Sequence, residues 1–242
     1  MFTWFHKLAS PPYFYKFAQK VAPWTGWIAV VLLVIGLYGG LWMAPPDYQQ
    51  GDGFRIIYIH VPSAWMSMFG YSFLAICAGI GLIWRMKLAS AVAAAAAPLG
   101  AAFTFLALVT GSLWGKPMWG TYWVWDARLT SELVLLFLYF GFMALNQSFS
   151  DQRTGDRASA ILALVGLVNL PIIHYSVVWW NTLHQGDTVF VGKQSDISMS
   201  MLVPLLIMIM AFMLYSATFV MKRLQVEILK RERNTAWVKE LL

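Results

Sequence analysis

The sequence predicts an all-α, polytopic membrane protein with six transmembrane helices and both termini in the cytoplasm. Of its 242 residues, 60% are hydrophobic and only 12% are charged, and the mean hydropathy is +0.63. Soluble domains are usually about half apolar and about a quarter charged. The surplus of apolar residues therefore requires a second apolar solvent, which is the lipid bilayer. This composition excludes a soluble enzyme, a nucleic-acid-binding module and a disordered tail.

Six apolar runs are long enough to cross a bilayer, which takes roughly 20 helical residues. They are separated by short loops that contain Pro, Gly or charge, and they cover about 22–43, 61–84, 90–113, 129–149, 158–180 and 199–221. The chain is thus predicted to be a single integral membrane domain over 1–242. Its charged tail, 222–242, is expected to be cytoplasmic and helical, either solvated at the membrane interface or docked onto a cytoplasmic partner.

The first, third and fifth runs contain residues that predict more than a membrane span. The second, fourth and sixth are predicted as spans from their length and composition alone. The first run is too long for a cleaved signal peptide and Pro45-Pro46 follows it without a cleavage site, so it is predicted to remain as a helix. Pro98 is expected to kink the third run. The fifth run contains Asn169, Pro171 and His174, which predict a polar, irregular helix within the membrane.

Lysine and arginine orient the six helices. Thirteen of the 17 fall in the two tails and in the second and fourth loops, and the other four are Arg55, Lys116, Arg128 and Lys193. Because cytoplasmic loops are enriched in Lys and Arg, both termini are predicted to be cytoplasmic. The first, third and fifth loops then face outward, into the periplasm if the host is a Gram-negative bacterium.

Two histidines and a tryptophan-rich segment share this predicted outer face. His60 lies at the end of the first outer loop, and His184 follows the fifth run. Between them, the segment Trp114–Asp126 has four Trp and one Tyr in 13 residues. Interfacial belts explain lone tryptophans, and this density favours a ligand surface.

The chemistry that fits these residues is haem binding. Two neutral imidazoles can hold a metal ion from opposite sides, and imidazole is a usual axial ligand of haem iron. His60 and His184 are therefore the candidate iron ligands. If their segment is helical or turned, the tryptophans can form one aromatic face for the ring. They are Trp114, Trp119, Trp123 and Trp125.

Charged residues of the outer loops are candidate partners for the haem carboxylates. Arg55, Lys116 and Arg128 can form charge-assisted hydrogen bonds with propionates. Asp126 can orient an indole N–H group or pair with Arg128. Alternatively, the histidines are structural hydrogen-bonding residues, and Arg128 forms a local ion pair with Glu132, four residues away.

Two absences bear on function. Cys77 is the only cysteine, so the sequence has neither an internal disulfide nor the C-x-x-C-H motif of covalent haem attachment. No G-x-x-x-x-G-K-[ST] motif is present, so any ATP hydrolysis would belong to another subunit.

One segment of the sequence matches a known family signature at all of its fixed positions. The segment Trp119-Gly-Thr-Tyr-Trp-Val-Trp-Asp126 matches W-G-x-x-W-x-W-D, the signature of membrane haem-handling proteins of cytochrome c biogenesis. With its length, six runs and flanking outer histidines, the whole chain resembles the CcmC family (haem exporter protein C). The resemblance implies that His60 and His184 ligate haem and that Trp114–Asp126 forms the platform.

The resemblance also implies a setting and partners. Members of this family are not enzymes; they hold b-type haem transiently and non-covalently at the periplasmic face of the bacterial inner membrane. They deliver it to a periplasmic haem chaperone. They work with an ATPase subunit, a second membrane subunit and a small single-span subunit, and with no nucleic acid.

Two other functions remain open from the residues alone. A quinol-linked electron-transfer cytochrome would hold haem between helices, with His174 as a ligand, because an ionisable residue within a span is a functional candidate. A structural hydrogen bond to a neighbouring helix is the alternative role of His174. A haem-free permease subunit of an ABC-type transporter would instead use the irregular third and fifth runs.

Overall fold

The six predicted spans are present as helices. The computed structural model describes residues 10–180, 182–184 and 197–241, so Lys7 and Lys193 of the charge count lie outside it. Within these ranges the chain is helical with no named strand, and six helical segments are long and apolar enough to cross a membrane. The predicted all-α, polytopic fold class is confirmed.

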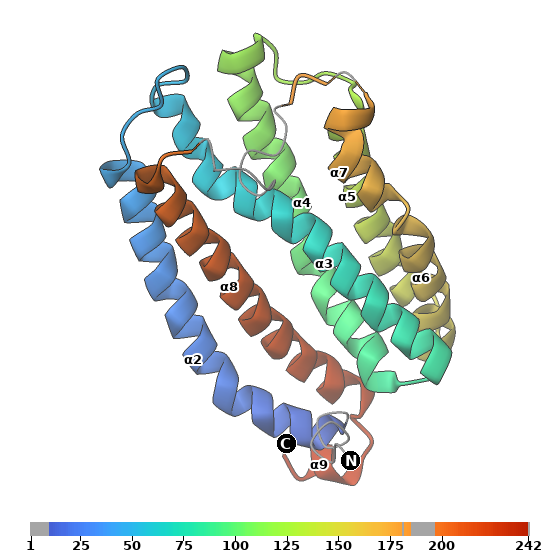
Figure 1. Cartoon of the computed structure of the whole chain (residues 1–242). Coiled ribbons are helices and arrows are strands. Elements are labelled where there is room, and N and C mark those ends of the chain that lie inside the picture. Colours follow the sequence, from blue (N-terminus) through green and yellow to red (C-terminus); the bar gives the residue numbers. More distant parts are fainter. Residues whose placement is uncertain (1–9, 181, 185–196, 242) are drawn as a thin grey trace.

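The helices follow one another through short connections (Figure 1). The first span joins α2 (Pro11–Tyr38) to a π-helical turn, η1 (Gly39–Met43), and the second joins a 3-10 turn, η2 (Asp52–Ile56), to α3 (Ile57–Trp84). The third and fourth spans are α4 (Lys87–Trp119) and α5 (Ala127–Gln147). The fifth consists of α6 (Gln152–Gly166) and α7 (Asn169–Trp179). The sixth is α8 (Met199–Arg231), and the short α9 (Ala236–Lys239) follows it.

Individual residues, and not hydropathy, determine where several helices begin and end. Pro11 opens α2, where its missing N–H group has no intrahelical partner to lose. α4 continues past the predicted end at 113 and stops only at Gly120, which has φ 77° in the left-handed region that favours glycine. Trp114 and Trp119 therefore lie on a helix, and the outer loop shrinks to 120–126.

The fifth span is interrupted, as its sequence predicts. α6 ends at Gly166 and α7 begins at Asn169. Pro171 cannot donate a hydrogen bond to Leu167, and its ring clashes with that carbonyl in a continuous helix, so the break falls at Leu167 and Val168. By contrast, α4 runs unbroken through Pro98.

Small residues let the helices approach closely. α3 packs along α4 and α2 along α8, and α5 and α6 cover the other side of the α3–α4 pair (Figure 1). The core between α3, α4 and α5 centres on Tyr139, whose hydroxyl donates to the Ser67 carbonyl at 2.8 Å. A Cβ atom at Gly100 would overlap the Tyr139 ring. Glycine is thus needed where these helices meet.

The beginning and the end of the described chain lie at the same end of the bundle, as an even number of spans requires (Figure 1). The Tyr15 and Trp237 rings lie 6.0 Å apart, centroid to centroid. The first part of the predicted tail continues α8 and buries Leu224 and Ile228 against the protein's own bundle. One face of this part of the tail therefore packs against the bundle, while Lys222, Arg223 and Lys230 remain exposed.

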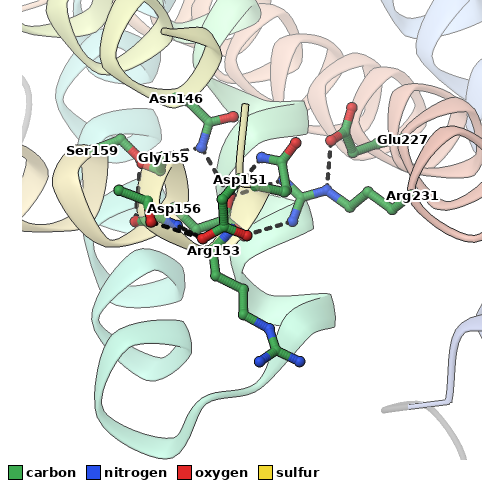
Figure 2. A network of polar contacts seen from close by, with 10 residues as sticks. Asn146, Asp151, Arg153, Gly155, Asp156, Ser159, Glu227 and Arg231 are labelled. Atoms are coloured by element: carbon green, nitrogen blue, oxygen red, sulfur yellow. Dashed lines mark hydrogen bonds and ion pairs between the residues drawn. The ribbon is translucent and has the colours of Figure 1, made fainter. Parts of the chain in front are cut away.

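A buried polar network secures the end of α8 (Figure 2). The Arg231 guanidinium donates to both carboxylate oxygens of Asp156 on α6, at 2.8 and 3.0 Å, and to Glu227 at 2.6 Å. The side chains of Asn146 and Gln152 donate to the same Asp156 carboxylate. The network joins α5, α6 and α8 at the terminus-bearing end.

Candidate functional site

His60 lies one turn into α3, at the end of the bundle opposite the chain termini. Its Nδ1 atom is 3.0 Å from Thr110 Oγ1 on α4. The Thr110 hydroxyl donates its own hydrogen to the Leu106 carbonyl at 2.6 Å. Since that hydrogen is engaged, the hydroxyl accepts from His60, which places the imidazole proton on Nδ1. His60 Nε2 then keeps its lone pair for a ligand.

His184 faces His60 across this end of the bundle. The two ring centroids are 6.3 Å apart, with 35° between the ring planes. His184 belongs to the connection between α7 and α8, of which 180, 182–184 and 197–198 are described. The sequence predicts that these two histidines share one face, and the structure places their rings next to each other.

Trp114 and Trp119 flank the histidine pair from the last turns of α4. The Trp114 ring lies edge-on to His60 with a centroid separation of 5.7 Å, and the Trp119 ring lies 6.4 Å from His184. The Trp114 indole Nε1 donates to Gln50 Oε1 at 2.8 Å, which fixes the orientation of its ring. Each histidine thus has one tryptophan beside it.

A small cavity of about 70 Å³ lies between these residues. Its lining is mostly apolar and includes both histidines, and its members are Gln50, His60, Gly111, Trp114, Met118, Trp119, Leu129 and His184. At Gly111, a Cβ atom would lie 3.0 Å from His60 Cε1. The absence of a side chain at Gly111 therefore leaves room for the imidazole.

The other two tryptophans of the predicted platform form a separate pair. Trp123 and Trp125 meet edge to face at 5.4 Å between ring centroids, and neither lines the cavity. Trp123 packs against the core cluster, and its buried Nε1 atom has no hydrogen-bond partner within the described residues. Trp125 is 76% exposed. The four rings thus form two pairs instead of one continuous face.

The predicted propionate cations have different surroundings. Arg55 donates to the Gly40 carbonyl at 2.8 Å and to Asp52 at 2.9 Å, so its guanidinium is already engaged. Lys116 donates to the Gly120 carbonyl at 3.0 Å and lies over the Tyr122 ring. Both cations stabilise the local loops.

Arg128 lies closer to the histidine pair. Its Nη1 atom is 3.4 Å from the Ile173 carbonyl, and its positive charge acts on both His60 and Glu132. Glu132 is buried one turn further along α5, where it accepts a hydrogen bond from Ser67 at 2.7 Å. Of the three predicted propionate cations, Arg128 is the one whose charge acts on His60.

Asp126 is a helix cap in this structure. Its Oδ1 atom accepts from the Leu129 backbone N–H group at 2.8 Å at the start of α5. N-capping by aspartate satisfies an N–H group that the helix cannot pair internally. The capped turn also places Leu129 in the lining of the cavity.

His174 occupies a different environment from the pair. It lies on α7 with its side chain exposed, and its ring centroid is 4.6 Å from that of Tyr175. It does not line the cavity between His60 and His184.

Several residues of the site were not predicted from the sequence. Thr110 and Gly111 precede Trp114 by four and three residues, which is the spacing of neighbours on one helical face. The sequence did not reveal this relation, because the helix was predicted to end at 113 and in fact continues to Trp119. Gln50 lies in the first outer loop, and no local pattern identifies it. Met118 and Leu129 resemble ordinary apolar residues.

The spacing of the two histidines suits a single metal ion between them. A metal–imidazole bond is about 2 Å, so two nitrogens on opposite sides of one ion are about 4 Å apart and their ring centroids about 6 Å. The observed 6.3 Å agrees with this separation. Within the described residues no group of three or more His, Cys, Asp or Glu side chains could hold an ion. A two-histidine site suits an iron whose other ligands come from a macrocycle.

Comparison with known proteins agrees with these features. A sequence model of the family described as heme exporter protein C (CcmC) matches residues 4–239. The chain is 54% identical over 242 residues to heme exporter protein C of Escherichia coli (strain K12), which covers 100% of this chain and 98% of that protein. It is 48% identical over 241 residues to heme exporter protein C of Haemophilus influenzae, covering 100% of this chain and 98% of that protein.

A more distant relative is a plant protein. The chain is 44% identical over 188 residues to a putative cytochrome c biosynthesis ccmC-like mitochondrial protein of Marchantia polymorpha. That match covers 78% of this chain and 79% of the relative.

Proposed function

We propose, from the premise that this chain belongs to the haem exporter protein C family of cytochrome c maturation components, that it holds haem between His60 and His184 and passes it to an acceptor protein. The observation that carries the proposal is the 6.3 Å separation of the two imidazole rings. The rings come from α3 and from the α7–α8 connection, so the fold itself brings them together.

Thr110 prepares His60 for this role. A histidine that ligates a metal usually donates its other ring N–H group to a fixed acceptor, which sets the tautomer and the ring orientation. The bond from His60 Nδ1–H to the Thr110 hydroxyl meets this requirement and would leave Nε2 free to bind iron.

The size of the cavity supports an exposed haem. Ligand pockets that enclose a small molecule are typically about 300–1,000 Å³, and the space between these residues is about 70 Å³. Most of the macrocycle would therefore lie outside it, against the outer surface. An exposed ring edge suits hand-over, because an acceptor can reach it directly.

The haem is expected to be b-type, bound non-covalently and transiently. Cys77 lies 17 residues after His60 on the same helix, which is about 25 Å along its axis and too far for a thioether bond to this haem. One ligand, His184, belongs to a connection outside the helices. Ligands on loops exchange more readily than ligands fixed within a packed helix.

The proposed setting follows the charge distribution. Lysine and arginine concentrate at the terminus-bearing end of the bundle, which supports a cytoplasmic position for that end. The histidine pair would then lie at the periplasmic face of a bacterial inner membrane. The acceptor is then a periplasmic haem chaperone. ATP hydrolysis would belong to an ATPase subunit acting with a second membrane subunit and a small single-span subunit.

The geometry favours neither rival function. His174 is exposed on α7 and does not line the cavity between His60 and His184, so this cavity gives no support for His174 as a ligand of a quinol-linked cytochrome. The break in the fifth span is explained locally by Pro171. It therefore gives no independent support for a permease.

Absorption spectroscopy of the purified chain, together with haem transfer to the chaperone, tests the proposal. The parent protein is expected to show a Soret band that His60→Ala and His184→Ala each weaken or shift. His174→Ala is the matched control, since it removes an exposed outer-half histidine, and its spectrum should be unchanged. A Soret band that persists unaltered in the His60→Ala, His184→Ala double variant would contradict the ligand assignment.

A further inference from the structure

A second cavity lies at the opposite end of the bundle from the histidine pair. It has a volume of about 580 Å³ and is formed by the turn between α3 and α4 and by the start of α6. Because it lies at the terminus-bearing end, where the apolar spans end, we expect it at the level of the lipid head groups of that leaflet. The haem site does not use this cavity.

Four cations line the cavity. Arg85 and Lys87 come from the α3–α4 turn, and Arg153 and Arg157 come from the first turns of α6. All four side chains are exposed, and none of them forms an ion pair or a side-chain hydrogen bond with any described residue. Figure 2 shows the Arg153 side chain extending away from the Asp156–Arg231 network, with its guanidinium outside the dashed contacts. Two loops distant in sequence thus present unpaired positive charge to one space.

The two carboxylates in the lining have other partners. Both oxygens of Asp156 accept hydrogen bonds from Arg231. Asp151 caps α6 by accepting from the Thr154 hydroxyl and backbone N–H group, and these bonds lower the pKa of its carboxyl. Asp151 also accepts from the Arg153 backbone N–H group at 3.4 Å, and the positive charge of Arg153 acts on its carboxyl. Four cations against these two engaged carboxylates still leave the cavity with a net positive lining.

The backbone of the α3–α4 turn adds to the positive field. α4 begins after Met86, whose side chain makes no capping hydrogen bond, so the first N–H groups of this long helix are uncapped beside the cavity. Uncapped helix N-termini favour anions. Arg85 has φ 54° in the left-handed region, which is costly for any residue with a side chain. A cation is therefore held where glycine would be less strained.

We infer that this cavity binds a phosphate group, supplied either by the head group of an anionic lipid or by a free phosphate. Arginine binds phosphate through paired N–H groups, and three of the four cations are arginines. Basic pockets between transmembrane helices on the cytoplasmic side suit lipid head groups of this class. Such a ligand would link the α3–α4 turn to α6. The inference is independent of the proposed function, because its residues lie at the other end of the bundle.

Native mass spectrometry of the detergent-solubilised full chain tests this inference. Phosphatidylglycerol and inorganic phosphate are titrated as separate probes, and adducts are counted on the parent protein and on the Arg153→Gln, Arg157→Gln double variant. The matched control is Lys16→Gln, Lys20→Gln, which removes two exposed cations from α2 at the same end but outside the cavity. Each surface cation contributes about 1 kcal/mol to binding an anionic lipid. The cavity variant is therefore expected to bind its ligand about tenfold or more weakly, and the control nearly as the parent does.

A second variant guards against misfolding. Arg85→Gly removes a cation and relieves the left-handed backbone, so it should keep the parent's melting temperature while weakening binding.

The outcomes separate the two sources of phosphate. Phosphatidylglycerol adducts that depend on the cavity arginines identify a lipid site. Inorganic phosphate adducts with the same dependence, without lipid adducts, identify a free-phosphate site. Failure of both probes to bind the parent, or equal losses in the cavity variant and the control, would overturn the inference.

Discussion

His60 Nδ1 and Thr110 Oγ1 lie 3.0 Å apart, and the threonine hydrogen is already donated to the Leu106 carbonyl. One hydroxyl on α4 thereby determines which nitrogen of an imidazole on α3 is free to bind. A metal ligand needs such support, because the second partner sets both the tautomer and the ring orientation. The contact connects the packing of two transmembrane helices to the chemistry of the outer face.

Replacing Thr110 with valine tests this support. Thr110→Val keeps the shape of the side chain but removes the acceptor for His60, so haem affinity should fall about 10–100-fold, the usual effect of losing such a partner. Haem titration followed by absorption measures the change, and the position of the Soret band should move with it.

Two further variants show whether the hydroxyl is the cause. Thr110→Ser should restore most of the affinity. Thr104→Val is the matched control, because Thr104 is buried on the same helix and donates to Gly100 in the same way without touching a histidine. Equal affinity losses at both threonines would show that the effect is only structural.

The division of the tryptophans predicts different effects on haem binding. Trp119 contacts His184, whereas Trp125 is exposed and contacts Trp123. Trp119→Ala should weaken haem binding by about threefold to tenfold, the value of one lost aromatic contact. Trp125→Ala should leave haem affinity unchanged in the same titration. A larger loss at Trp125 than at Trp119 would place the haem on the loop instead of beside the histidine pair.

The Asp156–Arg231 ion pair predicts a stability difference. Its side chains are 14% and 13% exposed, and Asp156→Asn leaves Glu227 as the remaining charged partner of Arg231. Losing the charge-assisted hydrogen bonds to Asp156 typically costs about 1.5–3 kcal/mol. Asp156→Asn should therefore lower the melting temperature in detergent substantially. Asp52→Asn is the control, since Asp52 is 80% exposed in its pair with Arg55 and such pairs contribute about 0–1 kcal/mol. Similar melting temperatures for the two variants would refute the structural role of the buried network.

Gly100 predicts a packing defect. Gly100→Val places side-chain atoms in the volume of the Tyr139 ring, and overpacking of this kind costs about 1–3 kcal/mol or more. The variant should give less folded protein by size-exclusion chromatography and a lower melting temperature. Gly53→Ala is the control, because an added Cβ atom there has no neighbour within 4 Å. A folded, equally stable Gly100→Val protein would mean that α4 and α5 are not packed as described.

The number of spans, the break in the fifth span and the shared position of the two histidines could be predicted from the sequence. Hydropathy predicts six spans, and the break in the fifth span follows from Pro171. The neighbouring positions of His60 and His184 follow from topology, since both fall at span ends on one face. These features depend on residue type and order alone.

The details of the site depend on backbone geometry that residue type does not determine. α4 extends to Trp119 and turns at Gly120, so Trp114 and Trp119 lie beside the histidines while Trp123 and Trp125 form a second pair. Thr110 and Gln50 were missed because their roles arise from contacts across 50 and 64 residues of sequence. Arg55 is engaged by Gly40 for the same reason.

Electron paramagnetic resonance of the ferric, haem-loaded protein tests the central claim most directly, because the iron signal reports its axial ligands. Ligation by His60 and His184 predicts a low-spin, six-coordinate signal in the parent that becomes high-spin in each single alanine variant. The His174→Ala protein should retain the parent signal. A low-spin signal that survives in the His60→Ala, His184→Ala double variant would contradict this assignment and place the iron elsewhere.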